Sequence, residues 1–164
     1  MFLTDANVFI EAKNRYYDFD ICPGFWDWMD AQVPEMKVCS IKPVYDELAG
    51  GGDSLSRWVK DRRADGRFLK VDDVAAQTFF ARVAATVQAG AFKPEAKAQF
   101  LSGADPWLVA KAGAIGATVV TQEKYQAGAQ RRVPLPNICQ AFGVPYIDTF
   151  ELLKQGAAKF RIAV

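Results

Sequence analysis

Hydrophobic residues follow two different spacings along the chain. Short continuous apolar runs are typical of buried parallel strands, whereas apolar residues at i, i+3 and i+4 are typical of helices. Short runs predict strands at 2–4, 37–41, 118–121 and 144–147. Stretches with helical spacing lie between them. This alternation predicts an α/β domain built around a mostly parallel sheet.

The stretches with helical spacing have recognisable beginnings and ends. They predict helices at 7–13, 25–32, 43–48, 54–63, 73–88, from 94, and at 105–114, 136–142 and 150–154. Asp105 is expected to be an N-cap, with Pro106 at the first helical position and Gly116 ending that helix. Asp53 or Ser54 is expected to be the N-cap of the helix predicted at 54–63. A short apolar piece at 68–71 leads into the next helix.

The chain is expected to form one domain over 1–164. It has no internal repeat, low-complexity tract or linker, and 164 residues is an ordinary size for a single domain. Because 51% of the residues are hydrophobic, a core can form without disulfides or a structural metal. The four tryptophans stand among other apolar residues, which favours core packing over stacking on bases.

The formal net charge is +1, so a polyanion would have to be bound by local clusters of basic residues. Two clusters are candidates for contacts with RNA phosphates. They consist of Lys60, Arg62 and Arg63, with Arg67 nearby, and of Arg131 and Arg132. A solvated surface is the alternative explanation for both clusters, and it is the favoured one for the first.

Histidine is absent, which excludes histidine acid–base catalysis, serine and cysteine triads and most zinc enzymes. Cys22, Cys39 and Cys139 have no paired spacing, so we expect reduced thiols, with Cys39 and Cys139 in the core. The N-terminus has no signal-peptide pattern, and no apolar run approaches the roughly 20 residues that span a bilayer. We therefore expect a cytoplasmic protein without membrane segments.

Acidic residues stand close to the ends of the predicted strands. Asp5 ends the first strand, Glu47 lies in the helix after the second, and Glu123 follows the third. Ligands of parallel sheets bind at the carboxyl ends of the strands, so these side chains are expected to share one edge. Asp105 joins them if its helix begins near that edge. Each acid alone has a structural alternative as a helix cap or a solvated residue.

Carboxylates brought together repel one another, and a divalent cation removes that conflict. Oxygen donors without histidine or thiolate favour Mg²⁺ or Mn²⁺ over zinc. A cation held in this way lowers the pKa of an attacking water and stabilises a leaving oxygen. The acids therefore predict a metal site suited to phosphodiester hydrolysis.

Four segments, in order, resemble the motifs of PIN domains. Residues 5–7 (Asp-Ala-Asn) are similar to the opening motif, and residues 44–48 resemble the glutamate helix. Residues 104–110 resemble the central aspartate helix, and residues 121–123 (Thr-Gln-Glu) resemble the Thr-x-Asp motif with glutamate in place of aspartate. The resemblance covers about residues 1 to 150.

This resemblance implies a three-layer α/β/α fold with a central, mostly parallel sheet of four to five strands, and a Mg²⁺- or Mn²⁺-dependent endoribonuclease. Asp5, Glu47 and Asp105 would be the core metal-binding acids, and Glu123 a fourth ligand, directly or through water. Asn7 and Thr121 would orient carboxylates or water. Many bacterial members are VapC-like toxins that commonly form dimers, so the expected partners are RNA, a cognate antitoxin and a second copy of the chain.

Three alternatives remain beside this interpretation. A PIN-like domain that binds RNA or protein without cutting is favoured by the glutamate at position 123. DNA cleavage is disfavoured by the absence of inserted DNA-binding elements. A phosphoryl-transfer or receiver domain is disfavoured because a haloacid-dehalogenase-like enzyme needs aspartate where Asn7 stands, and no phosphorylatable aspartate stands out for a receiver.

Overall fold

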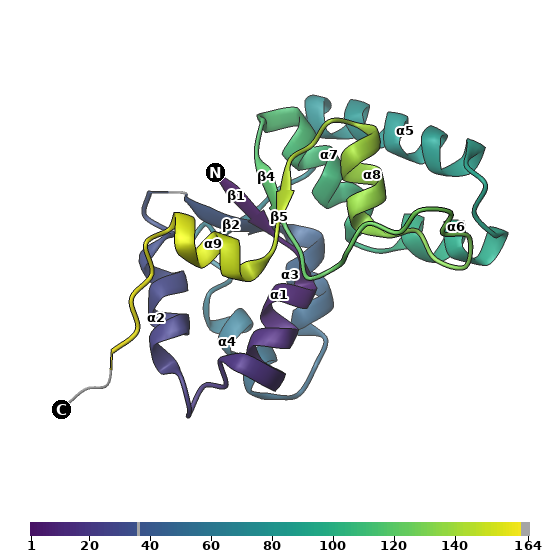
Figure 1. The fold of residues 1–164 in the computed structure, drawn as a ribbon. Helices are drawn as coiled ribbons and strands as arrows, with labels where there is room; N and C mark the ends of the chain where they lie inside the picture. The colour runs from purple at the N-terminus through teal and green to yellow at the C-terminus, as the bar shows by residue number, and fades with distance from the viewer. Residues whose placement is uncertain (36, 162–164) are drawn as a thin grey trace.

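A single parallel sheet forms the centre of the computed structural model, which describes residues 1–35 and 37–161 (Figure 1). The strands in the order β3-β2-β1-β4-β5 are all parallel to their neighbours. Their bounds are β1 (Phe2–Thr4), β2 (Val38–Ile41), β3 (Phe68–Leu69), β4 (Thr118–Val120) and β5 (Tyr146–Ile147). This confirms the predicted α/β class, and the five strands lie within the predicted range of four to five.

The apolar piece at 68–71 contributes a strand that the sequence pattern did not separate from a connecting segment. Ser40 lies opposite Phe68, and the Ser40 backbone N–H donates to the Arg67 carbonyl at 2.8 Å. Two residues are too short for a periodic signal, so the pairing with β2 defines this strand. On the other side, β4 ends at Val120, one residue before the expected end.

The described residues form nine α-helices and one π-helical turn. The helices are α1 (Ala6–Glu11), α2 (Pro23–Ala31), α3 (Lys42–Ala49), α4 (Ser54–Asp61), α5 (Val74–Ala89), α6 (Pro94–Ser102), α7 (Asp105–Ile115), α8 (Leu135–Ala141) and α9 (Thr149–Gln155). The expected helix at 7–13 ends at Glu11 and continues as the π-helical turn η1 (Ala12–Tyr16).

Side-chain caps begin three of these helices. Asp53, Asp73 and Asp148 each accept a hydrogen bond from a backbone N–H three residues later, at 2.9 Å. The expectation that Asp105 is an N-cap is wrong. Ala104 already has helical backbone angles and is the N-cap, so Asp105 is the first residue of α7 and its side chain makes no capping bond.

Helices cover both faces of the sheet. The connection from β1 to β2 runs one way along the sheet and the connection from β3 to β4 runs the other way. Right-handed crossovers therefore place α1 to α4 on one face and α5 to α8 on the other, as Figure 1 shows. The direction reverses between β1 and β4, so this is the point where an open α/β sheet binds its ligand.

The core lies between these layers. α7 contacts β2 and β4 and packs closely on α5. Trp26 and Trp58 are buried, with ring centroids 4.9 Å apart, and Trp107 stacks on Phe80 at 3.9 Å. Cys39 and Cys139 are buried as expected. None of the helices within 1–35 and 37–161 is both long and apolar enough to cross a bilayer.

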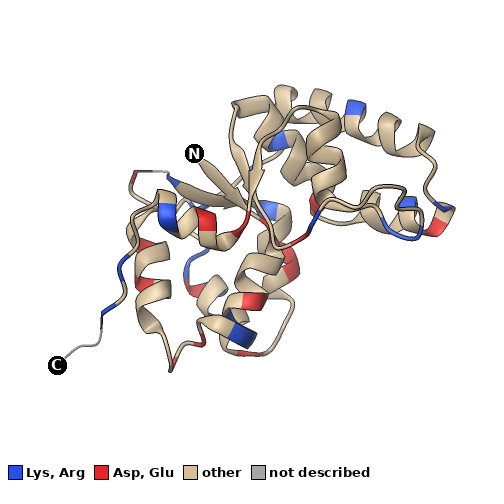
Figure 2. Ribbon diagram, in the orientation of Figure 1, with Lys and Arg blue, Asp and Glu red and all other residues tan. Residues whose placement is uncertain are grey.

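Charged residues of both signs are scattered over the ribbon in Figure 2. α5 departs from this pattern, because Arg82 is its one charged residue. Arg82 lies over the rings of Phe79 and Phe142, at 5.1 and 5.5 Å from their centroids. Basic and acidic residues thus alternate along the fold, and this view shows no side of the ribbon that carries basic residues alone.

We expect Gly113→Ala to destabilise the protein, although glycine-to-alanine changes usually stabilise a helix. A Cβ at Gly113 in α7 would lie 2.2 Å from the Phe79 ring of α5, so the ring or the two packed helices would have to shift. The loss in the free energy of unfolding should be about 1–3 kcal/mol, measured by denaturant melts.

Gly50→Ala is the matched control, because a Cβ there meets its nearest atoms at 3.6 Å. Equal or greater stability of Gly113→Ala relative to the parent would contradict the packing described between α5 and α7.

Candidate active site

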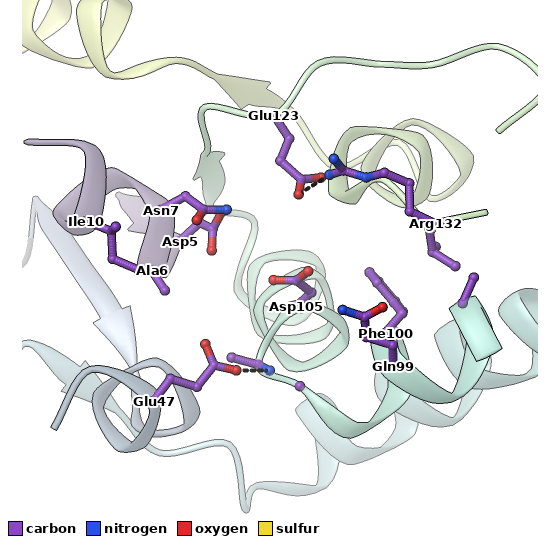
Figure 3. Close-up of a pocket in the computed structure, with 14 residues that line it drawn as sticks. Asp5, Ala6, Asn7, Ile10, Glu47, Gln99, Phe100, Asp105, Glu123 and Arg132 are labelled. Atoms are coloured by element: carbon purple, nitrogen blue, oxygen red, sulfur yellow. Dashed lines mark hydrogen bonds and ion pairs between the residues drawn. The ribbon is translucent and has the colours of Figure 1, made fainter. Parts of the chain in front are cut away.

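The four candidate acids line one cleft of about 560 Å³ at the carboxyl edge of the sheet (Figure 3). Asp5 enters it from the end of β1, Glu47 from α3, Asp105 from the start of α7, and Glu123 from the segment after β4. In Figure 3 their carboxylates point into a common space. The cleft lies at the reversal point between β1 and β4, where a ligand site is expected.

Asp5 is the most buried of the four acids, with 3% of its surface exposed. It occupies the N-cap position of α1, but its side chain makes no capping bond. Its Oδ2 instead accepts hydrogen bonds from the Thr121 hydroxyl at 2.9 Å and from the Asn7 amide at 3.3 Å. Asp5 thus stands at the start of α1, while its carboxylate is bound by Thr121 and Asn7 and is turned toward the cleft.

Thr121 links the strand ends on either side of the cleft. Its hydroxyl accepts from the Glu123 backbone N–H at 3.2 Å and donates to Asp5. A buried hydroxyl with both contacts fixed has one orientation, so Thr121 sets the direction of the Asp5 carboxylate. Thr121 and Asn7 therefore both contact the Asp5 carboxylate, as residues that orient it would.

Glu47 and Asp105 come together through the start of α7. Glu47 Oε1 accepts a hydrogen bond from the Ala104 backbone N–H at 2.8 Å. This bond satisfies a free N–H group at the N-terminus of α7 and ties that helix to α3 across the edge of the sheet. The carboxylate of the neighbouring Asp105 is left to face the cleft (Figure 3).

Glu123 is held by two donors of its own. Its Oε1 forms an ion pair with Arg132, and its Oε2 accepts from the Leu135 backbone N–H at 2.8 Å. Leu135 is the first residue of α8, so the carboxylate stabilises a helix start, which was the structural alternative for this acid. The longer glutamate arm thus serves α8 and Arg132 as well as the cleft.

Burial and mutual repulsion disfavour the ionised form of the two inner acids. Burial is the largest cause that raises the pKa of Asp105 to about 8, followed by the charges of Asp5, Glu123 and Glu47, while Arg132 acts in the opposite direction. Burial likewise raises the pKa of Asp5 to about 6, with the Thr121 hydrogen bond opposing it and Glu123 adding to it. The cleft therefore holds more negative charge than its own donors neutralise.

Among the residues that the structure describes, no three acidic or sulfur side chains are grouped closely enough to hold one metal ion. Glu47 and Glu123 are engaged at opposite walls, by α7 and by Arg132. The carboxylates of all four acids thus converge on the cleft, but those of Glu47 and Glu123 are already bound by other groups of the protein.

The expected basic residues separate into two groups. Arg132 lines the cleft, and Arg131 beside it is exposed but outside the cleft lining. Lys60, Arg62 and Arg63 lie outside the cleft.

Two residues of the first cluster have a structural role. Arg62 is ion-paired with Asp30 at 2.7 Å, and the buried Arg67 contacts the same aspartate. Arg62 and Arg67 therefore hold α2 to the segment after α4.

The remaining wall of the cleft comes from α6, which the sequence did not indicate as functional. Gln99 and Phe100 line the cleft together with Asp105, and all three are labelled in Figure 3. Gln99 is exposed and Phe100 is buried. No motif singles out α6, because its place over the cleft depends on the crossover from β3 to β4.

The chain matches one protein-family model over residues 2–160, a domain of unknown function named DUF4411. It belongs to this family. No curated protein matches the sequence. Among solved structures, the crystal structure of FitAcB from Neisseria gonorrhoeae is similar with a TM-score of 0.50 and 19% identity, over 90% of this chain and 96% of that one. This likeness bears on the fold, which is the PIN-like three-layer arrangement that the sequence predicted.

We expect the substitution Asp105→Asn to stabilise this protein at alkaline pH in the presence of a chelator. Between the ordinary pKa of 3.8 and the folded value of about 8, the folded state retains a proton that the unfolded state has lost. Stability contributed by this proton is complete below pH 3.8 and is lost as the pH rises to about 8. Asparagine removes this dependence.

Thermal melts from acidic to alkaline pH measure the effect. The variant should exceed the parent by on the order of 5 kcal/mol near pH 8, with the difference shrinking toward pH 4. An equal gain at both ends of the range would show that ionisation of Asp105 is not its cause.

Proposed function

We propose that the cleft is a divalent-metal nuclease site that hydrolyses RNA phosphodiester bonds. The observation that carries the proposal is the convergence of Asp5, Glu47, Asp105 and Glu123 on one cleft at the reversal point of the sheet. The family model names no function, so the activity rests on this chemistry and on the resemblance of the four segments to PIN motifs.

The oxygen donors of the cleft are of the chemical kind that Mg²⁺ or Mn²⁺ prefers. The cleft offers carboxylate oxygens, and the Asn7 and Gln99 side chains add amide oxygens, while the chain has no histidine. Asp5 and Asp105 would hold the cation, with Glu47 and Glu123 contributing directly or through water. A bound cation supplies a water of lowered pKa and neutralises charge on the phosphate.

The other residues of the cleft prepare these oxygens. Thr121 and Asn7 fix the Asp5 carboxylate, and the Glu47 bond to Ala104 fixes the position at which α7 presents Asp105. Positioning of this kind lowers the reorganisation needed during catalysis. Arg132, with 52% of its side chain exposed, is placed to receive a phosphate at the mouth of the cleft.

A toxin role, with a cognate antitoxin and a homodimeric assembly, completes the proposal. It is supported by the PIN-like fold and by the resemblance of the motifs to VapC-like toxins. An antitoxin that inhibits the enzyme would cover the cleft or neutralise its acids. Expression of the parent chain with and without the genes adjacent to its own tests this part, with growth arrest by the parent alone as the expected result.

Cleavage of unstructured RNA should depend on Mg²⁺ or Mn²⁺ and fall by about 100-fold or more in Asp105→Asn, because a cation site loses a charged ligand. Gel analysis of labelled RNA incubated with purified protein measures the rate. Asp27→Asn is the matched control, because Asp27 is exposed on α2 and lies outside the cleft. Metal-independent cutting, or equal rates in both variants, would contradict the proposal.

The second candidate is a PIN-like domain that binds RNA or protein without cutting. The engagement of Glu123 by Arg132 and Leu135, and the absence of a ready three-acid group in the described residues, favour it. Calorimetric titration with Mn²⁺ separates the two. Binding that Asp105→Asn abolishes supports the nuclease, and no binding by the parent supports the non-catalytic domain.

Arg132→Gln should have opposite effects on metal and RNA. Loss of the guanidinium frees Glu123 and removes a positive charge that opposes a cation, so Mn²⁺ affinity should rise. RNA affinity should fall by about tenfold, because one charge-assisted phosphate contact is lost. Calorimetry and fluorescence anisotropy measure the two constants. A parallel fall in both would indicate that Arg132 only supports the local structure.

A further inference from the structure

A second cavity, of about 600 Å³, lies on the β2–β3 side of the molecule, and we call it the β2–β3 groove. Its walls combine basic and aromatic side chains from α3, β3 and α7 and from the segments after α4 and β3. The basic members are Lys42, Arg63 and Lys70, and the aromatic members are Tyr45, Phe68 and Trp107. None of these six residues lines the acidic cleft.

The groove and the cleft share one edge of the sheet. Lys42 directly follows β2 and Lys70 directly follows β3, as Asp5 directly follows β1. In the strand order, the groove lies at β2 and β3 and the cleft at β1 and β4. With neighbouring strands about 4.8 Å apart, the two centres are roughly 10 Å apart along the edge. That span corresponds to about three phosphates of a stacked strand.

The same two helices separate the two cavities. Glu47 of α3 lines the cleft, and Tyr45 of the same helix lines the groove. Likewise Asp105 of α7 lines the cleft, and Trp107 lines the groove. A strand that leaves the cleft over α3 and the start of α7 therefore reaches the groove without crossing the sheet.

Two of the cations are available to an anion. Lys42 is ion-paired with Asp46 at 2.5 Å and lies over the Tyr45 ring. Within the described part of the chain, no ion pair or side-chain hydrogen bond involves Arg63 or Lys70, and both side chains are exposed. Asp72 is the one other acid of the groove lining, so the groove has a positive balance. Arg63 thus differs from its neighbour Arg62, which is held by Asp30.

The aromatic wall offers partly exposed rings. Tyr45 and Phe68 pack edge to face at 5.2 Å, and Trp107 is supported from one side by Phe80. All three lining rings are half-buried, so each is fixed in place and keeps part of its surface accessible. Aromatic rings beside cations that track a phosphate backbone are the features by which proteins bind single-stranded nucleic acid.

We propose that the β2–β3 groove binds single-stranded RNA on one side of the segment held in the cleft. Arg63 and Lys70 contact phosphates there, and the aromatic wall contacts bases. This inference rests on the proposed nuclease function, since the cleft defines which RNA the groove extends. It also assigns the protein a substrate class, because duplex RNA would not expose its bases to the wall.

The test compares RNA affinity in two double variants with the same change in net charge. Arg63→Gln/Lys70→Gln removes the two available cations, and Lys154→Gln/Lys159→Gln removes two exposed cations outside the groove. Both are made in an Asp105→Asn background to prevent cleavage. Fluorescence anisotropy with a labelled, unstructured RNA oligonucleotide gives the Kd over a range of salt concentrations.

The groove variant should raise the Kd about tenfold and reduce the slope of log Kd against log salt by about 1.4, as expected for two phosphate contacts with a single strand. The control variant should keep the slope of the parent. An oligonucleotide carrying 4-thiouracil should also cross-link to a peptide containing Tyr45, Phe68 or Trp107.

Equal Kd and slope in the two double variants would overturn the groove assignment, whether or not the parent cuts RNA. Binding of RNA through Arg63 and Lys70 without any cleavage by the parent would uphold the groove and contradict the proposed nuclease. Preference of the parent for duplex over single-stranded RNA would also overturn the assignment of the groove.

Discussion

The parallel pairing of β1 with β4 is the constraint on which the site depends. Thr4 lies opposite Val120, and the Asp5 backbone N–H donates to the Val120 carbonyl at 2.9 Å. Asp5 and Thr121 therefore leave the sheet side by side, although 116 positions separate them, and their side chains meet in a buried hydrogen bond. Since the direction in which successive strands are added to the sheet reverses between β1 and β4, the connections that leave these two parallel strands diverge, and the cleft opens between them.

The cleft concentrates negative charge that the protein only partly compensates. The outer acids, Glu47 and Glu123, each stabilise the start of a helix, which offsets part of their charge. The inner acids, Asp5 and Asp105, face each other with raised pKa values because burial and mutual repulsion act in the same direction. A cation would relieve this conflict, so the repulsion that lowers the stability of the protein also supports the proposed function of the cleft.

The glutamate at position 123 illustrates how one methylene changes a site. The two oxygens of this glutamate reach the Arg132 guanidinium and the Leu135 N–H group, while the residue lines the cleft. The longer side chain joins the cleft to α8 and holds a guanidinium at its mouth. Under the proposed function, this arrangement would couple the charge of the cation site to the contact with a phosphate, and a bound RNA strand would compete with Glu123 for Arg132.

Local patterning was sufficient for four of the five strands, because buried parallel strands are continuous apolar runs, and the acids at their ends must share an edge. It therefore determined the fold class and the candidates Asp5, Glu47, Asp105 and Glu123. Only the tertiary structure decided that β3 is a strand, that Ala104 rather than Asp105 caps α7, and that α6 closes the cleft. It also decided which cations are available, since Arg62 and Arg63 are adjacent in sequence but only Arg62 meets an acid. These outcomes depend on contacts between distant segments, which no local spacing records.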